Sequence, residues 1–412
     1  MRREDLCHDV RQRLVRLPAP HQAHYGVVPL PPPEDAVPLG PALARSEAAN
    51  QALARNDALA TDLHDPYLLS RVLTRREAVS SSGIEGTNST LYELLAVEET
   101  EDGDAAAAAV QVRDYAKALD TFLPRAQSEG AMIFTLALVQ DLHRAVMRGD
   151  TAYRDVPGDL RQVVAWIGGG GNIAYSSFNQ PPPEHVPACL AQSLEYLRNE
   201  GMQSMTQGIL TRMAIGHAHF EAVHPFRDGN GRVGRLLLPL MMAAEGHVPL
   251  YLSPYIEAHK QAYYDALKAA QQRLEWHALV GYLADAVVAT VDELMVTRRA
   301  LADLRAIWLT RRAFRGGSAA LRALDLLPHY PVITVKRLAK ELGVTFRAAD
   351  TAVHLLQDAG ILTECTGHRR NRLFVATEAL TVINRPFGAE PVLPEQQRNL
   401  VASRRLVVPL CQ

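Results

Sequence analysis

The stretch His224-Pro-Phe-Arg-Asp-Gly-Asn-Gly-Arg-Val-Gly-Arg235 decides the fold of this chain. It sets a histidine, a carboxylate, a Gly-Asn-Gly turn and two arginines in a fixed order. The flanking residues 210–221 and 232–244 carry apolar side chains at helical spacing. We therefore expect a loop that links two helices, with the glycines opening the second one. The unpaired N–H groups of a helix start bind anions readily.

Several residues of this loop suit reaction at a phosphate group. His224 is the natural general base, because histidine titrates near neutral pH. Asp228 is a candidate Mg²⁺ ligand, since Mg²⁺ takes carboxylate oxygens together with phosphate oxygens and waters. Gly229 and Gly231 can adopt positive φ, which lets the turn curl around a phosphate.

The remaining polar residues of the loop add hydrogen-bond donors. The amide of Asn230 can donate to a phosphate oxygen, and Arg232 and Arg235 supply planar charged donors. Phe226 is expected to anchor the loop in the core. Phosphoryl-type transfer depends mostly on positioning and charge stabilisation, and this set supplies both.

The order and spacing of these residues resemble the HPFx(D/E)GNGRxxR signature of the Fic family, without a gap. The resemblance extends over about residues 29–296. It implies a mainly α fold, a helical bundle with a β-hairpin flap. It also implies a protein AMP-transferase that uses ATP and Mg²⁺. His224 would activate a Ser, Thr or Tyr hydroxyl of a target protein, or of the chain itself.

A second motif lies upstream, in Ser80-Ser-Ser-Gly-Ile-Glu-Gly-Thr87. Within it, Ser81-x-x-x-Glu85-Gly86 resembles the (S/T)xxxE(G/N) inhibitory motif of Fic proteins, and it follows a predicted helix over 65–79. The resemblance implies that Glu85 pairs with Arg235 and keeps it from the γ-phosphate of ATP. The family also includes members that remove AMP, in which this glutamate positions a water. Without the signature, the same residues would mark only a helix end and a solvated turn.

A hairpin is expected at about residues 161–180. Residues 161–168 are β-prone, the glycine-rich 168–172 form a turn, and 173–178 form a return strand. The segment resembles the Fic flap, whose edge, here Trp166, Ile167 and Gly168, aligns an extended target segment by strand addition. The alternative is a surface hairpin without a task. Aromatic residues at 251, 255, 263 and 264 fit either an adenine site or core packing.

The sequence predicts a four-part organisation. A proline-rich, extended arm and a helical region fill 1–97, the catalytic core 98–301, a winged helix-turn-helix domain 318–377, and a tail 378–412. The core is expected to open with an acidic loop at 98–104 and a helix over 105–122.

The winged helix prediction depends on two helices, 334–342 with Thr334 as N-cap and 346–359, followed by two strands around a basic turn within 361–375. Residues 318–377 hold eight Lys or Arg and five Asp or Glu. The wing is better supplied with basic groups than the second helix, and it carries His368, Arg369, Arg370 and Arg372. DNA binding through 334–375 is one interpretation, and protein contact or assembly of a homodimer is the other.

Bulk properties exclude some classes of function. The 412 residues include 43 Lys or Arg and 45 Asp or Glu, which gives a net charge of −2 and no general attraction to nucleic acid or acidic membranes. Four cysteines, at 7, 189, 365 and 411, have no metal spacing and suggest reduced thiols in a cytoplasm. No apolar run of about 18 residues and no apolar signal core is present, so we expect no membrane association.

Two further functions stay open. A Fic-type transferase can move UMP, phosphocholine or a γ-phosphate instead of AMP. Alternatively, the chain is a DNA-binding regulator in which the Fic domain senses a nucleotide. The sequence specifies no particular target protein.

Overall fold

The computed structural model describes residues 1–61, 68–100, 106–366 and 371–394. Its contacts divide the chain into two compact units. Unit 1 consists of Met1–His64, Ser80–Asn88 and Asp114–Val291, and unit 2 consists of Asp65–Val79, Ser89–Arg113 and Asp292–Gln412. Both are built mainly from helices, as the sequence predicts, and each is described by itself.

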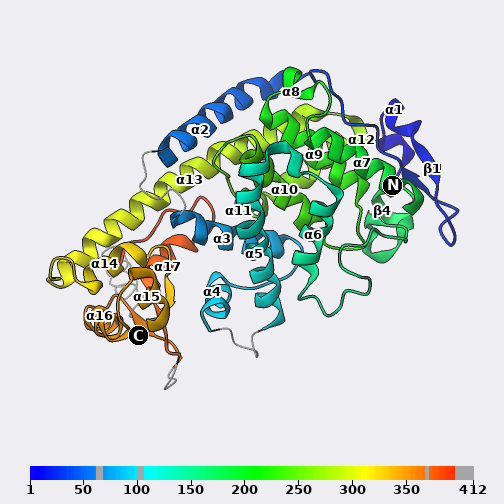
Figure 1. The fold of residues 1–412 in the computed structure, drawn as a ribbon. Helices are drawn as coiled ribbons and strands as arrows, with labels where there is room; N and C mark the ends of the chain where they lie inside the picture. Colours follow the sequence, from blue (N-terminus) through cyan, green and yellow to red (C-terminus); the bar gives the residue numbers. More distant parts are fainter. Residues whose placement is uncertain (62–67, 101–105, 367–370, 395–412) are drawn as a thin grey trace, which may run out of the picture. The chain divides into compact units, whose positions relative to one another are not determined.

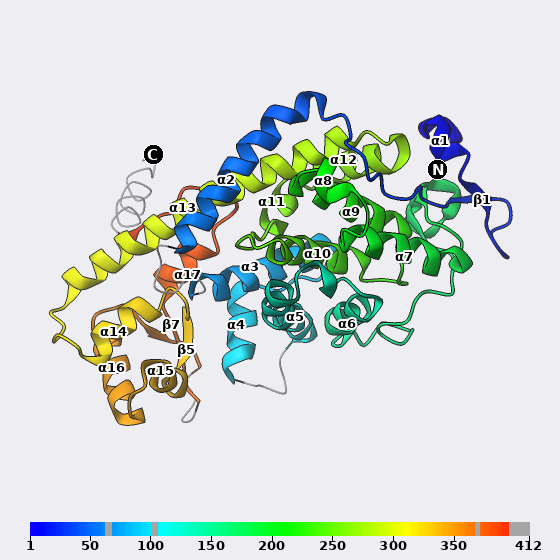
Figure 2. The same ribbon diagram turned by 45° about the horizontal axis from the view of Figure 1, so that its top comes forward.

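The core of unit 1 is a helix pair, α9 (Ile209–Val223) and α10 (Asn230–Ala244). Every residue of α9 is buried, because other helices surround it on all sides. Helices α7 (Val186–Leu197) and α12 (Lys260–Arg273) pack on α9, and α6 (Leu136–Met147) packs on α10, an arrangement visible in Figures 1 and 2. The predicted helix–loop–helix around residues 224–235 is therefore present at the centre of unit 1.

The other helices of unit 1 cover this core. They are α2 (Leu43–Thr61), α8 (Gln203–Thr206), α11 (Ser253–Ala258) and the unit 1 parts of α3 (Leu68–Ile84), α5 (Ala107–Glu129) and α13 (Trp276–Arg311). The last three are continuous helices that contribute residues to both units.

The N-terminal arm is more regular than predicted. Residues 8–27 form α1 (His8–Arg11) and an antiparallel pair, β1 (Leu14–Arg16) with β2 (Tyr25–Val27), whereas the proline-rich residues 28–39 have neither helix nor strand. The physical reason is local burial, since the arm's apolar residues pack with Phe178 and Ala222 in a small cluster of their own.

The hairpin predicted at 161–180 is present. Strands β3 (Trp166–Gly168) and β4 (Ser176–Asn179) pair antiparallel, with Ile167 opposite Phe178. Both strands start later than predicted, because residues 161–165 precede β3 without strand pairing and Ile173–Tyr175 form a 3₁₀ turn before β4. The four consecutive glycines that begin at Gly168 all have positive φ, between 57° and 89°. Only glycine adopts such a run without steric cost, which explains this sequence. Residues 161–181 are called the flap segment below.

Two helix boundaries differ from the prediction. Helix α3 continues to Ile84, so the serines at 80–82 lie inside it and not after it. Helix α4 (Leu91–Thr100) takes up the start of the acidic segment expected as a loop. Tertiary contacts outweigh the low helix propensity of serine at 80–82. The rest of the acidic segment, 101–104, lies outside the described residues.

Within unit 2, residues 318–377 fold in the order helix, strand, helix, helix, strand, strand. These elements are α14 (Ala319–Leu326), β5 (Val332–Thr334), α15 (Val335–Leu342), α16 (Phe346–Asp358), β6 (Thr363–Glu364) and β7 (Leu373–Val375), followed by α17 (Thr377–Ile383). The sheet order is β5-β7-β6, all antiparallel. The Thr334 hydroxyl accepts from the Arg337 N–H at 3.2 Å, so the predicted cap is confirmed.

Strand β5 was not predicted, and the basic wing residues 368–370 lie outside the described part of the chain. Among the helices that the structure describes, none is long and apolar enough to cross a membrane.

Candidate active site

His224 lies where α9 ends. Its backbone has φ 49°, a left-handed value that is rare for a residue with a side chain, and its N–H bonds to the Phe220 carbonyl at 3.0 Å. This turn separates the imidazole from the fully buried helix. Burial, with a further contribution from the positive charge of Arg161, lowers the His224 pKa to about 4. The ring is therefore neutral at pH 7 and able to accept a proton.

Asn230 closes the loop that follows. Its Oδ1 accepts from the Phe226 N–H and its Nδ2 donates to the Phe226 carbonyl, both at 2.8 Å. The amide that we expected to face a phosphate thus also closes the loop onto Phe226. Phe226 is fully buried, as expected of an anchor.

His143 on α6 supports the loop from below, and no local pattern in the sequence pointed to it. Its ring stacks on Phe226 with the centroids 3.7 Å apart. Its Nδ1 accepts from the Gly158 N–H at 2.8 Å, so the proton sits on Nε2, which donates to the Asp228 carbonyl at 3.0 Å. Burial lowers the His143 pKa to about 4, which keeps this tautomer neutral.

Asp228 offers one carboxylate at the surface of the loop. Its Oδ1 accepts from the Gly229 N–H at 2.6 Å, which holds the side chain at the start of α10. The residues that the structure describes include no cluster of three or more His, Cys, Asp or Glu able to hold a metal ion. A single carboxylate fits Mg²⁺, because Mg²⁺ takes most of its other ligands from phosphates and water.

The glycines of the loop leave room for an anion. Gly229 has φ 77° and precedes the first turn of α10, whose N–H groups have no helical acceptor. A Cβ at Gly231 would lie 2.3 Å from Glu85 Oε1 and 3.0 Å from Arg235 Nη1. The space above Gly231 is therefore where a negatively charged oxygen sits in this structure, and the oxygen belongs to Glu85.

The two arginines of the loop differ in their contacts. Arg232 is buried and donates from Nη1 to the Val146 carbonyl at 3.2 Å, while its buried Nε has no partner in the described part of the chain. Arg235 donates from Nε to the Ser81 hydroxyl at 2.8 Å and from Nη2 to the Ser81 carbonyl at 2.9 Å. Its Nη2 also bonds to Glu85 Oε1 at 2.8 Å, so the ion pair implied by the resemblance is present.

The Glu85–Arg235 pair is unequally buried, with 36 % of the Glu85 side chain exposed and 2 % of the Arg235 side chain. Burial alone would raise the Glu85 pKa, but the charge and hydrogen bond of Arg235 outweigh it, so the pKa is lowered. The same contact raises the Arg235 pKa against the effect of burial. Gly86, with φ 87°, ends helix α3 just after Glu85 and aims that residue at Arg235.

A buried polar group behind Arg235 was also missed by sequence reasoning. His217 Nδ1 donates to the Gly234 carbonyl at 3.2 Å, so its Nε2 accepts from the Tyr263 hydroxyl at 2.6 Å. Glu221 packs against Gly234, and burial raises its pKa to about 7. Of the aromatic residues considered for an adenine site, Tyr263 belongs to this buried group, whereas Tyr264 is 40 % exposed.

The flap segment presents one free edge. Gln272 Nε2 donates to the Ser177 carbonyl at 2.8 Å, and Asn179 Nδ2 donates to the Tyr25 carbonyl at 2.9 Å, so β4 is held from its far side. The predicted edge residues, Trp166 to Gly168, form the other strand, and the Ile167 side chain is exposed. Residues 166–168 are thus placed as an edge strand.

Two parts of the chain match known families. Residues 43–122 match the N-terminal region of the Fic/DOC family and residues 133–242 match the Fic/DOC family, which supports a Fic/DOC assignment for this part of the chain. A probable protein adenylyltransferase of Aquifex aeolicus (strain VF5) is 34 % identical over 97 residues, which are 24 % of this chain and 28 % of that protein. Protein adenylyltransferase Fic of Drosophila grimshawi is 26 % identical over 219 residues, 52 % of this chain and 41 % of that protein.

The chain thus spans less than half the length of these curated relatives. A solved structure, that of a Fic family protein from Desulfovibrio desulfuricans G20, aligns with a TM-score of 0.51 at 20 % identity. It covers 84 % of this chain and 98 % of that one. At this identity the likeness shows the fold alone.

Proposed function

From the Fic/DOC assignment and the geometry of the loop, we propose that this protein is an autoinhibited protein AMP-transferase. The observation that carries the proposal is the Glu85 carboxylate bonded to Arg235 above Gly231. It occupies the place at a helix start where an anionic substrate would bind. A neutral His224 stands at the other end of the same loop.

The proposed reaction forms one bond and breaks one. The hydroxyl oxygen of a target Ser, Thr or Tyr attacks the α-phosphorus of ATP while His224 takes the hydroxyl proton. The bond between the α-phosphorus and the bridging oxygen breaks, and pyrophosphate leaves. A neutral histidine suits this step, since a protonated ring accepts no proton.

The loop supplies protein ligands for both ATP and Mg²⁺. The buried Arg232 Nε, which bonds to no described protein atom, and the N–H groups of the first turn of α10 are donors for the phosphates. Asp228 would hold Mg²⁺, which would neutralise phosphate charge. Arg235 would bind the γ-phosphate once Glu85 has left it.

Glu85 acts as the brake in this account. While it is paired, the carboxylate takes the Nη2 donor of Arg235 and repels the incoming γ-phosphate. We also propose that the same site can remove AMP, with Glu85 then orienting a water. The edge strand 166–168 would align an extended segment of the target protein, or of the chain itself, by strand addition.

The donor is tested by direct competition. Purified Glu85→Gly protein is incubated with Mg²⁺ and ATP labelled at either the α- or the γ-phosphate, and the label on protein is measured. We expect labelled protein only with ATP labelled at the α-phosphate. Unlabelled ATP should reduce this labelling more strongly than UTP or CDP-choline does. Protein labelled by the γ-phosphate would mean that the enzyme transfers phosphate and not AMP. Stronger competition by UTP or CDP-choline than by ATP would mean that another molecule is the donor.

A DNA-binding role is the second candidate, and the order of elements in residues 318–377 motivates it. We propose that these residues form a winged helix-turn-helix module. Its basic side chains are partly engaged, since Arg372 pairs with Asp350 at 2.9 Å and Arg337 with Glu99 at 3.1 Å. This favours contact with protein, such as a second copy of the chain. A gel shift with duplex DNA at low salt distinguishes DNA binding from protein contact, because a shifted band would support the DNA-binding interpretation.

A further inference from the structure

Arg161 is one of the largest fully buried side chains of unit 1, with 1 % of the residue exposed. Within the described residues, its guanidinium donates to backbone carbonyls: Nε to His224 at 2.7 Å, Nη1 to Val163 at 2.8 Å, and Nη2 to Pro181 at 2.8 Å and Val223 at 3.3 Å. Its own N–H bonds to the Pro225 carbonyl at 2.9 Å.

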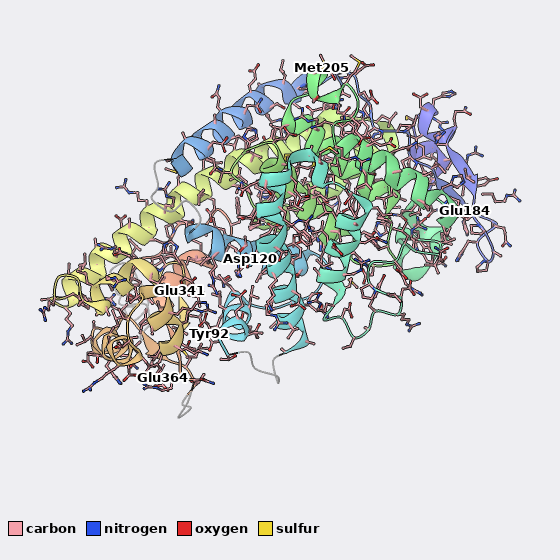
Figure 3. The ribbon with its side chains drawn as sticks, viewed as in Figure 1. Tyr92, Asp120, Glu184, Met205, Glu341 and Glu364 are labelled. Atoms are coloured by element: carbon pink, nitrogen blue, oxygen red, sulfur yellow. The ribbon has the colours of Figure 1, made fainter. Side chains whose placement is uncertain are left out.

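No carboxylate within the described residues forms a salt bridge with Arg161. Glu184, a carboxylate whose charge raises the Arg161 pKa, lies on the surface, as Figure 3 shows. Burying a cation against carbonyl dipoles alone is costly unless those dipoles are held in place. The cost shows in the Arg161 pKa, which burial lowers to about 10. Such an arrangement fixes the positions of the carbonyls around it.

The carbonyls that Arg161 binds come from two segments. Val223 to Pro225 form the end of α9 and the start of the catalytic loop. Val163 lies just before β3 and Pro181 just after β4, at the two ends of the flap segment. One side chain therefore joins the backbone of the proposed base to both ends of the hairpin whose edge would carry the target.

We propose that Arg161 is a positioning residue that sets the flap segment in register with His224, so that a target hydroxyl aligned on the flap reaches the imidazole. The inference rests on the proposed function. Arg161 touches no substrate and acts through the backbone of His224. The anion-binding turn is held separately, by Asn230 and His143. Loss of Arg161 should therefore impair transfer to protein and leave nucleotide binding intact.

The test uses full-length Glu85→Gly protein as the active background and adds Arg161→Met or Arg161→Lys. ATP affinity is measured by calorimetry, and transfer of AMP is measured as kcat and KM. We expect an ATP Kd within about twofold of the background and a kcat lower by roughly 10- to 100-fold, the usual cost of an ångström-scale misplacement. Arg161→Lys keeps the charge and some of the hydrogen-bond donors, so its kcat should lie between those of the background and Arg161→Met.

Arg212→Met is the matched control. Arg212 is also buried, lies at the opposite end of α9, and donates to the Gln207 carbonyl and to Glu245. It should lower stability and leave kcat unchanged. An equal loss of kcat in Arg212→Met would overturn the proposal, since the effect of Arg161 would then be one of stability alone.

A second readout separates this proposal from the proposed function. Hydrogen exchange of residues 160–182 and 222–228 reports the contacts of Arg161 whether or not AMP is transferred. Faster exchange of both segments in Arg161→Met, and of neither in Arg212→Met, supports the link even if the background transfers no AMP. Unchanged exchange in both segments overturns it.

Discussion

Glu85 Oε1 lies 2.8 Å from Arg235 Nη2, in the space that a Cβ at Gly231 would fill. The chain thus places its own carboxylate against a buried guanidinium at the start of a helix, where an oxygen of a phosphate would be equally well bound. The carboxylate keeps about a third of its side chain exposed while the guanidinium is almost wholly buried. The more exposed partner of this pair is therefore Glu85, and release of the brake should begin with it.

Gly86→Ala should partly release the brake. Gly86 has φ 87°, and a Cβ at this position would meet no described atom within 4 Å, so alanine would add backbone strain of about 1 kcal/mol without a clash. Strain just after Glu85 should weaken its contact and raise basal AMP transfer by up to about fivefold. Gly343→Ala, at the positive-φ C-cap of α15, is the control. It should cost similar stability, and a similar rise in transfer there would refute the local explanation.

Ser81→Ala should weaken the brake by a different route. The Ser81 hydroxyl accepts from Arg235 Nε, and a hydrogen bond to a charged group is worth about 1.5–3 kcal/mol. Its loss should raise basal transfer several-fold while the Glu85 contact itself remains. Ser82 is buried on the same turn, and Arg235 directs its side-chain donors to Ser81 and Glu85. Initial transfer rates of Ser81→Ala and Ser82→Ala are compared, and equal rates would argue against a specific role of Ser81.

The contiguous part of the site and its pairing with Glu85 could be predicted from the sequence motifs, whereas the contacts of Arg161 and His143 could not. His224, Asp228 and Arg235 stand within one short stretch, so their order alone indicated a loop between two helices. Arg161, the first residue of the predicted hairpin, and His143 reach that loop from 63 and 85 residues away, and neither was expected to contact it. No local pattern marks such contacts.

The extent of α3 shows a second limit of sequence reasoning. Three consecutive serines and a glycine favour a helix end, yet α3 continues through Ser80–Gly83. Ser81 is completely buried and bonds twice to Arg235, and these tertiary contacts hold the turn helical. The loop-closing contacts of Asn230 with Phe226 were likewise not predicted from the sequence.

Glu221→Gln should stabilise the protein at alkaline pH. Burial raises the Glu221 pKa from 4.5 to about 7, so this group favours the folded state when protonated and that contribution is lost as pH rises through 7. Glutamine stays neutral, so the variant should gain on the order of 1–3 kcal/mol at pH 8 and nothing near pH 4.5. Urea unfolding at several pH values measures the difference. A gain independent of pH would contradict the assignment, and the exposed Glu129→Gln should show no gain.

His143→Phe should loosen the loop from below. Phenylalanine keeps the stacking on Phe226 but removes the bonds to the Gly158 N–H and the Asp228 carbonyl. One buried and one partly buried backbone group lose their partner, so we expect a loss of about 2–4 kcal/mol in stability and weaker binding of Mg²⁺-ATP. Thermal unfolding and ATP calorimetry in the Glu85→Gly background measure both. His247→Phe, at a half-exposed position paired with Asp57, should leave ATP binding unchanged.

The central claim is that Glu85 restrains an AMP transfer that needs His224. The most direct test measures AMP bound to protein, by intact-mass spectrometry after incubation with Mg²⁺-ATP, for wild type, Glu85→Gly, and Glu85→Gly with His224→Ala. We predict strong AMP addition, including self-modification, by the single variant alone. Equal addition by wild type and Glu85→Gly, or addition that survives the loss of His224, would contradict the account.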